Sequence, residues 1–125
     1  MNKEISTNGA PSAIGPYSQG IDTGSLVFVA GQIGREAVSG EMPDGVEAQT
    51  EQVMKNIAAI LDAAGLSWAD VVKTTCFLAD IADFEAFNGV YKNFVGDPAP
   101  ARSTFAVKDL PRGARVEVEA IAARS

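Results

Sequence analysis

Pro100-Ala-Arg-Ser-Thr-Phe105 and Arg115-Val-Glu-Val-Glu-Ala-Ile-Ala122 are the two stretches that decide the fold of this chain. Both alternate their side chains with the two-residue period of a β-strand. Lys108-Asp-Leu-Pro-Arg-Gly113, which lies between them, carries the Pro and Gly typical of a turn. The pattern predicts a β-hairpin near the end of the chain.

The spacing of three polar side chains in this hairpin allows two interpretations. A turn centred near Leu110 and Pro111 would place Thr104 opposite Glu117 and Arg102 diagonal to Glu117. Facing side chains lie about 5 Å apart and diagonal ones about 7–8 Å apart, so these groups could converge on a small keto acid. An exposed strand pair with a surface ion pair explains the same spacing, and such pairs add little stability. The spacing alone favours this structural interpretation.

The composition is that of one soluble globular domain, which we expect to span residues 1–125. Apolar residues make up 46% of the chain and charged residues 21%. The net charge is −6, and the cations are scattered apart from Arg112 and Arg115. Because nucleic-acid binding normally uses a basic patch, we predict no nucleic-acid partner.

The cysteine content and the N-terminus predict a cytoplasmic protein. Cys76 is the one cysteine, which excludes an intrachain disulfide and indicates a reducing compartment. It lies in the apolar run Val71–Leu78, where a buried structural thiol is expected. Residues 1–6 lack an apolar signal region, and no segment approaches membrane-spanning length, so we predict no membrane partner.

The absence of histidine restricts the possible chemistry. Without His, and with one Cys, zinc sites and Ser-His or Cys-His triads are excluded, and we predict no metal site. Neither standard glycine spacing of a phosphate-binding loop is present. Any catalysis must therefore use carboxylates, Arg, Tyr, hydroxyls, backbone groups and water.

Periodicity along the chain predicts an α+β fold in the order β-β-β-α-β-α-β-β. The expected strands lie at residues 4–7, 17–22, 25–30 and 71–78 and in the two C-terminal stretches. One expected helix follows Asp44, and the other follows Asp80 or Asp83. Two helices can cover one face of such a sheet, yet residues 26–30 and 71–78 are apolar beyond simple alternation. Oligomerisation through the open face would cover the rest.

The whole chain resembles the RidA/YjgF family of reactive intermediate deaminases. The most specific match is Pro100-Ala-Arg-Ser followed by Val116-Glu-Val-Glu-Ala. Further matches are distributed along the chain at residues 10–19, 30–33, 49–57, 63–66 and 72–75, and at Phe84 and Asn88.

The resemblance implies a chorismate-mutase-like α+β fold, with a mixed sheet and two helices on one face, assembled as a homotrimer with sites in clefts between subunits. It also implies hydrolysis of 2-imino acids such as 2-iminobutanoate and 2-iminopropanoate to 2-keto acids and ammonia, without a cofactor. A non-catalytic 2-keto acid-binding or regulatory module on the same trimer is the alternative.

Roles for two charged residues are carried over from the resemblance. Arg102 would grip the substrate carboxylate, because its planar fork suits a bidentate contact. Glu117 would hold and activate the water that attacks the imine carbon. An Arg nearby would favour the ionised form of this carboxylate. Glu119 receives no catalytic role.

The remaining site residues are also implied by position. Tyr17 would contact the substrate through its hydroxyl, and Gly31 would offer backbone groups to the imine nitrogen or the leaving ammonia. Asn88 would lie beside the pocket, or on the helix surface or a trimer contact, and Phe84 would form an apolar wall. Thr104 stands where the family often has Cys; its hydroxyl can still donate and accept hydrogen bonds, so it could hold the water with Glu117.

Overall fold

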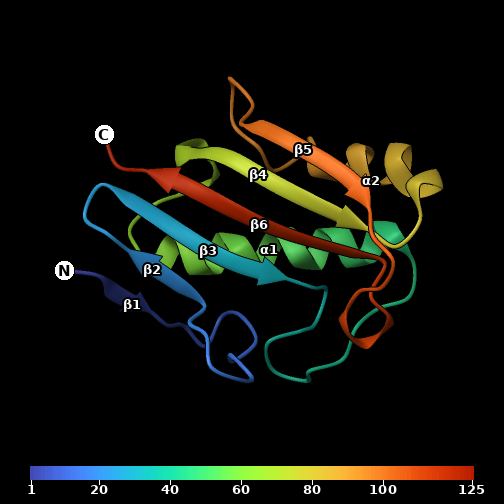
Figure 1. Ribbon diagram of the computed structural model, residues 1–125, viewed down its shortest axis with the longest axis horizontal. Helices are drawn as coiled ribbons and strands as arrows, with labels where there is room; N and C mark the ends of the chain where they lie inside the picture. Colours follow the sequence, from blue (N-terminus) through green and yellow to red (C-terminus); the bar gives the residue numbers. More distant parts are fainter.

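The computed structural model describes residues 1–125 as a six-stranded sheet with two helices on one face (Figure 1). The elements are β1 (Lys3–Ile5), β2 (Gly20–Asp22), β3 (Leu26–Gln32), α1 (Val46–Ala63), β4 (Val71–Leu78), α2 (Phe84–Tyr91), β5 (Ala101–Ala106) and β6 (Val116–Ala123). Short 3-10 turns lie at η1 (Trp68–Asp70), η2 (Ile81–Asp83) and η3 (Pro111–Gly113). The predicted order of strands and helices and the α+β class are confirmed. Neither helix combines the length and apolar character needed to cross a membrane.

The predicted C-terminal hairpin is wrong, because β5 and β6 are not neighbours. The strand order is β1-β2-β3-β6-β4-β5, so β4 lies between them. β4 pairs with β5 in parallel and with β6 in antiparallel orientation. The alternation of β5 and β6 indicates which side chains share a face, but it does not determine which strand lies next to which. β4, an apolar strand of eight residues, takes the position with a partner on each side.

The core lies between the helices and one face of the sheet. α1 presents an apolar stripe at helical spacing, as predicted, and α2 packs beside it. Largest among the fully buried core side chains are Phe87, Met54, Ile57, Ile60, Leu61 and Leu78. β6 contributes every second residue to this core, namely Val116, Val118, Ala120 and Ala122.

The opposite face of the sheet is covered by no other element of the chain (Figure 1). Phe28 and Phe105 are 41% and 45% exposed there, although both are large apolar side chains. Phe105 packs edge-on against Phe77, with ring centroids 5.4 Å apart. Ile121 faces Phe28 across the β3–β6 pair. Thr75 and Glu119 of the same face lie between these two pairs, so the face exposes two separate apolar patches. Large apolar side chains left exposed in this way often mark an interaction surface.

Buried amide side chains fix the loops at one end of the sheet. The fully buried Asn56 of α1 donates from Nδ2 to the carbonyl oxygens of Ile33 (3.2 Å) and Arg35 (2.9 Å). Gln49, about two turns earlier on the same side of α1, accepts at Oε1 from the N–H of Arg115 at 2.7 Å. Each loop thus satisfies its backbone groups through a helix side chain.

The Asn56 contacts predict a stability effect. Asn56→Ala leaves the carbonyl oxygen of Arg35 without its donor and that of Ile33 with the N–H of Arg35 alone, and we expect a loss of about 1–3 kcal/mol in the free energy of unfolding. Urea unfolding of both proteins measures this difference. Asn93→Ala is the matched control, because the Asn93 side chain is exposed and makes one long bond to Gly89. Equal losses in the two variants would contradict the prediction.

Candidate active site

Arg102 and Glu117 lie on opposite faces of the sheet in one chain. Arg102 of β5 pairs with the buried Thr74 of β4, so its side chain is on the face covered by the helices. Glu117 of β6 pairs with Phe77, so its side chain is on the open face. The predicted convergence of Arg102, Thr104 and Glu117 within one chain is therefore wrong. In a direct hairpin, even-numbered residues of β5 would face odd-numbered residues of β6. With β4 between the two strands, even-numbered residues of β5 and of β6 both align with even-numbered residues of β4. Arg102 and Glu117 therefore point to opposite faces.

Arg102 lies in a cage of aromatic rings from α2. Its guanidinium carbon is 4.8 Å from the ring centroid of Tyr91, 5.5 Å from that of Phe84 and 5.7 Å from that of Phe87. Its Nη1 donates to Oδ1 of Asn88 at 2.7 Å. We call these five residues the Arg102 cluster. The structure thus brings Asn88 and Phe84, two of the residues implied by the resemblance, to Arg102, on the side of the sheet away from Glu117.

The Arg102 cluster holds a positive charge in position without neutralising it. Cation–π contacts and one amide fix the guanidinium, and Arg102 forms no ion pair. Tyr91 is held in turn by Thr74, since the two hydroxyl oxygens lie 2.8 Å apart. Burial raises the pKa of Tyr91, so this phenol stays neutral. The remaining guanidinium N–H groups are available to a carboxylate.

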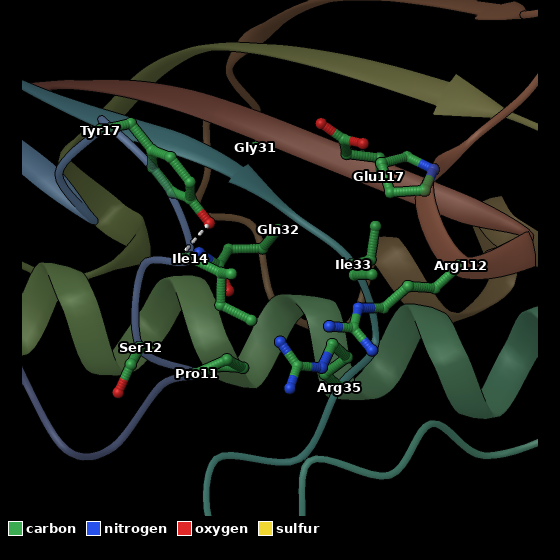
Figure 2. A pocket seen from close by; sticks show the side chains of 11 residues that line it. Pro11, Ser12, Ile14, Tyr17, Gly31, Gln32, Ile33, Arg35, Arg112 and Glu117 are labelled. Carbon is green, nitrogen blue, oxygen red and sulfur yellow. Dashed lines mark hydrogen bonds between the residues drawn. The ribbon is translucent and has the colours of Figure 1, made fainter.

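Glu117 lines a cavity of about 390 Å³ at the end of the open face (Figure 2). We call it the Glu117 pocket, and it is lined by Pro11, Ser12, Ile14, Tyr17, Gly31, Gln32, Ile33, Arg35, Pro111, Arg112 and Glu117. The structure therefore brings together three of the predicted site residues, Tyr17, Gly31 and Glu117. Tyr17 is 52% exposed and accepts at its hydroxyl from the N–H of Ile14 at 3.3 Å.

Gly31 lies directly against the Glu117 carboxylate. The pairing of β3 with β6 shifts register between Val29 and Gln32, which leaves one extra residue in β3. This bulge turns the Gly31 backbone toward Glu117. A Cβ atom at position 31 would overlap with Oε2 of Glu117, so any larger residue would displace the carboxylate. Glycine at position 31 therefore allows the Glu117 side chain to keep its observed position.

The environment of Glu117 favours its protonated form. Burial raises the pKa of this carboxyl, and the negative charge of Glu119 on the same face raises it further. We expected a nearby Arg102 to favour the ionised form, and within one chain this expectation is wrong because the sheet separates the two groups. A carboxylate with a raised pKa is a stronger proton acceptor than an ordinary one.

Thr104 is placed differently from the prediction. It lies on the helix-covered face beside Cys76, and its Oγ1 is buried with no hydrogen-bond partner. Within one chain it cannot share a water with Glu117, which is on the other face. Burial raises the pKa of the Cys76 thiol, in agreement with the structural role predicted for it.

Sequence reasoning missed two arginines in the Glu117 pocket. Arg35 follows β3 and Arg112 lies in η3, and both side chains line the cavity (Figure 2). Loop residues carry no periodicity, so nothing in the pattern indicated their direction. The closeness of Arg112 to Arg115 was the one available signal, and it was misleading, because Arg115 turns away to pair with Asp83 at 2.5 Å.

Comparison with known proteins identifies the family. Residues 7–124 match the family model described as Endoribonuclease L-PSP, and a YjgF gene product from E. coli shares the fold at TM-score 0.92 and 43% identity. The chain belongs to the RidA/YjgF family. The fold expected from the resemblance is therefore confirmed, whereas the trimer stays a prediction.

Other RidA/YjgF proteins match over nearly their full length. A 2-iminobutanoate/2-iminopropanoate deaminase from Mus musculus is 46% identical over 123 residues, which cover 98% of this chain and 91% of that protein. The protein of the same name from Escherichia coli K12 is 45% identical over 127 residues, which cover 99% of this chain and 99% of that protein. The crystal structure of E. coli TdcF with bound serine is 45% identical, with a TM-score of 0.95 over 98% of this chain and 99% of that one.

The raised pKa of Glu117 predicts how stability depends on pH. As pH rises above 4.5, the ordinary value for a Glu, the unfolded chain releases this proton before the folded chain does, so the folded state loses stability. Glu117→Gln removes this loss. We expect the variant to be at least as stable as wild type at pH 7, and the difference to vanish at pH 3–4. Urea unfolding at both values measures this. A variant less stable at pH 7 would contradict the prediction.

Proposed function

We propose that this protein is a deaminase that hydrolyses 2-imino acids, of the 2-iminobutanoate and 2-iminopropanoate class, to 2-keto acids and ammonia. The relatives that carry this name are 45–47% identical to it over nearly the whole chain. The observation that carries the proposal is the Glu117 carboxylate, packed against Gly31 in a concave pocket with a raised pKa. It is the one carboxylate lining that pocket, and the chain has no histidine to replace it.

We infer that the complete site forms between two copies of the chain in a homotrimer. One chain separates its Arg102 cluster from its Glu117 pocket by the sheet, and each is incomplete alone. β5 is an edge strand, and the open face beside it exposes Phe28 and Phe105. Packing these apolar surfaces between copies would bury them. The Arg102 edge of one copy would then meet the Glu117 pocket of the next.

In this arrangement the two charged groups divide the work. Arg102 binds the substrate carboxylate through its free N–H groups and orients C2 of the imine. Glu117 accepts a hydrogen bond from a water and removes its proton as the water oxygen bonds to C2. The imine reacts in its protonated form, so addition of water gives a neutral carbinolamine, and the proton held by Glu117 passes to its nitrogen. The C–N bond then breaks with its electron pair on nitrogen, and ammonia leaves. As the C=O bond of the keto acid forms, the hydroxyl proton passes through Glu117 to the departing ammonia, which leaves as ammonium.

The other predicted residues support these steps. Gly31 lets the backbone approach the reacting atoms and offers its N–H and carbonyl groups to the substrate nitrogen. Tyr17 contacts the substrate from the loop between β1 and β2. Asn88 holds Arg102, and Phe84 closes the apolar side of the guanidinium. Thr104 comes to the site with Arg102 rather than with Glu117, since both are on β5. The reaction balances with water alone, so no cofactor is invoked.

Charge and cysteine content support our proposals on partners and compartment. The family model is described as an endoribonuclease, but this chain has a net charge of −6, and its arginines do not form a strip that could follow a phosphate backbone. We therefore propose small imino and keto acids, rather than nucleic acid, as its ligands. The single buried Cys76 suits a reducing compartment, and we propose the cytoplasm.

The decisive experiment generates 2-iminobutanoate in situ with a threonine dehydratase and traps the remaining imine with semicarbazide. We expect added wild-type protein to speed the loss of trappable imine. Arg102→Lys keeps the charge but loses the planar fork and the stacking, so we expect a decrease of about tenfold or more in rate. Arg115→Lys is the matched control, because Arg115 forms an exposed ion pair away from the site.

Glu117→Gln separates catalysis from binding in the same assay. We expect this variant to lose turnover while still binding 2-ketobutyrate, measured by calorimetry. If wild type binds 2-ketobutyrate but never speeds the loss of imine, the protein is a keto acid-binding module instead. Equal rates for wild type, Arg102→Lys and Arg115→Lys would contradict the assigned role of Arg102.

A mixing experiment tests the shared site. Arg102→Ala and Glu117→Gln subunits, each inactive alone, are unfolded together and refolded as a mixture. In a mixed trimer one cleft joins an intact Arg102 to an intact Glu117, so activity should return to about a quarter of the wild-type value. The same variants refolded separately and then combined are the control. Absence of recovery in mixed trimers verified by mass would place both residues in one subunit's site.

A further inference from the structure

Two guanidinium groups line the Glu117 pocket and have no acidic partner. Neither Arg35 nor Arg112 belongs to any of the three ion pairs of the chain, and Glu117 is the one carboxylate lining the cavity. Figure 2 shows the two side chains extending into the pocket from different segments. With two guanidinium groups against one carboxylate, the lining of the cavity has an excess of positive charge, and a concave site of this kind attracts anions. In a chain of net charge −6, two unpaired arginines at one cavity require an explanation.

The two arginines reach the pocket from different local structures, and hydrogen bonds hold Arg35. The backbone carbonyl of Arg35 accepts from Asn56 at 2.9 Å, and its Nε donates to the carbonyl of Gly40 at 3.3 Å, so both ends of the residue are fixed. Arg112 has φ 58°, the one positive value outside glycine in the chain. This left-handed conformation is disfavoured for a residue with a side chain, and the Arg112 side chain lines the pocket from it.

The charge balance of the site indicates what the pair binds. In the proposed function, Arg102 from the neighbouring copy takes the carboxylate next to the imine. A monocarboxylic substrate then leaves at least one of Arg35 and Arg112 without a counterion, even when Glu117 is ionised. A second carboxylate on the substrate side chain would supply it, and a carboxylate accepts two N–H bonds from each planar guanidinium fork.

We propose that Arg35 and Arg112 form a second anion-binding subsite, which takes the side-chain carboxylate of a dicarboxylic 2-imino acid. This proposal rests on the proposed function and names the substrate class of the same site. It makes the two arginines specificity-determining residues that do not take part in bond making or breaking. An ion pair to an acidic residue of a neighbouring copy is the competing role, and the test below separates it.

The test compares two imines. The imine of glutamate and 2-iminobutanoate are each released in situ by a suitable amino acid oxidase, and semicarbazide traps what remains. We expect wild type to accelerate loss of the glutamate imine at a rate at least comparable to that for 2-iminobutanoate. In the double variant Arg35→Gln/Arg112→Gln, the ratio of the first rate to the second should fall about tenfold or more. Arg35→Lys/Arg112→Lys should give an intermediate ratio, since charge remains without the fork.

The matched control removes the same charge elsewhere. Arg115→Gln/Arg124→Gln deletes two arginines that pair with Asp83 and Asp22 outside the pocket, and its ratio should stay at the wild-type value. An unchanged ratio in Arg35→Gln/Arg112→Gln, or no acceleration of the glutamate imine by wild type, overturns the subsite. A changed oligomeric mass in that variant with an unchanged ratio assigns the arginines to an interface instead.

Binding distinguishes failure of the subsite from failure of the proposed function. If wild type hydrolyses neither imine, calorimetry with 2-ketoglutarate and 2-ketobutyrate replaces the rates. A tenfold fall in the affinity ratio in Arg35→Gln/Arg112→Gln then supports the subsite while the deaminase fails. If wild type hydrolyses 2-iminobutanoate and the ratio is unchanged in Arg35→Gln/Arg112→Gln, the result supports the deaminase and refutes the subsite.

Discussion

The central position of β6 is the constraint on which the rest of the structure depends. β6 pairs with β3 on one side and β4 on the other, and Val116, Val118, Ala120 and Ala122 are all buried under the helices. Because strand residues alternate, Glu117 must then face the open side. A slip of one residue would bury two carboxylates and expose the valines, at a large cost in free energy. The core thus fixes the direction of the carboxylate.

Separation of Arg102 from Glu117 by the sheet has a chemical consequence. An ion pair between them within one chain would occupy the guanidinium fork and lower the pKa of the carboxyl. Instead, Arg102 is fixed by aromatic rings and Asn88, and Glu117 keeps a raised pKa through burial. Each group therefore remains available for a ligand. Arg102 and Glu117 could meet only where two copies of the chain are in contact. In the proposed trimer, activity would therefore depend on assembly.

Periodicity was sufficient to predict the helices and strands, but it did not predict which strands lie next to one another in the sheet. The strand over Val71–Leu78, the helix ending before Gly65 and the two alternating C-terminal stretches were all found from their patterns. Alternation gives the faces of a strand and leaves its partner open, so β4 was not expected between β5 and β6. Tyr17, Gly31 and Glu117 were brought together as the family resemblance suggested. Arg35 and Arg112 lie in loops, where backbone hydrogen bonds rather than periodicity set the direction of a side chain.

α1 links the core to the pocket through polar side chains that face inward. Its apolar residues bury the closed face, while Asn56 and Gln49 bond the backbone of the two loops that carry Arg35 and Arg112–Arg115. These amides are themselves buried, so removing either one would leave loop groups without partners. The geometry on the open side of the sheet is therefore set from the helix side. The hydrogen bonds of Asn56 and Gln49 thus contribute both to stability and to the shape of the pocket. A substitution in α1 that leaves the apolar stripe intact can therefore still change the site.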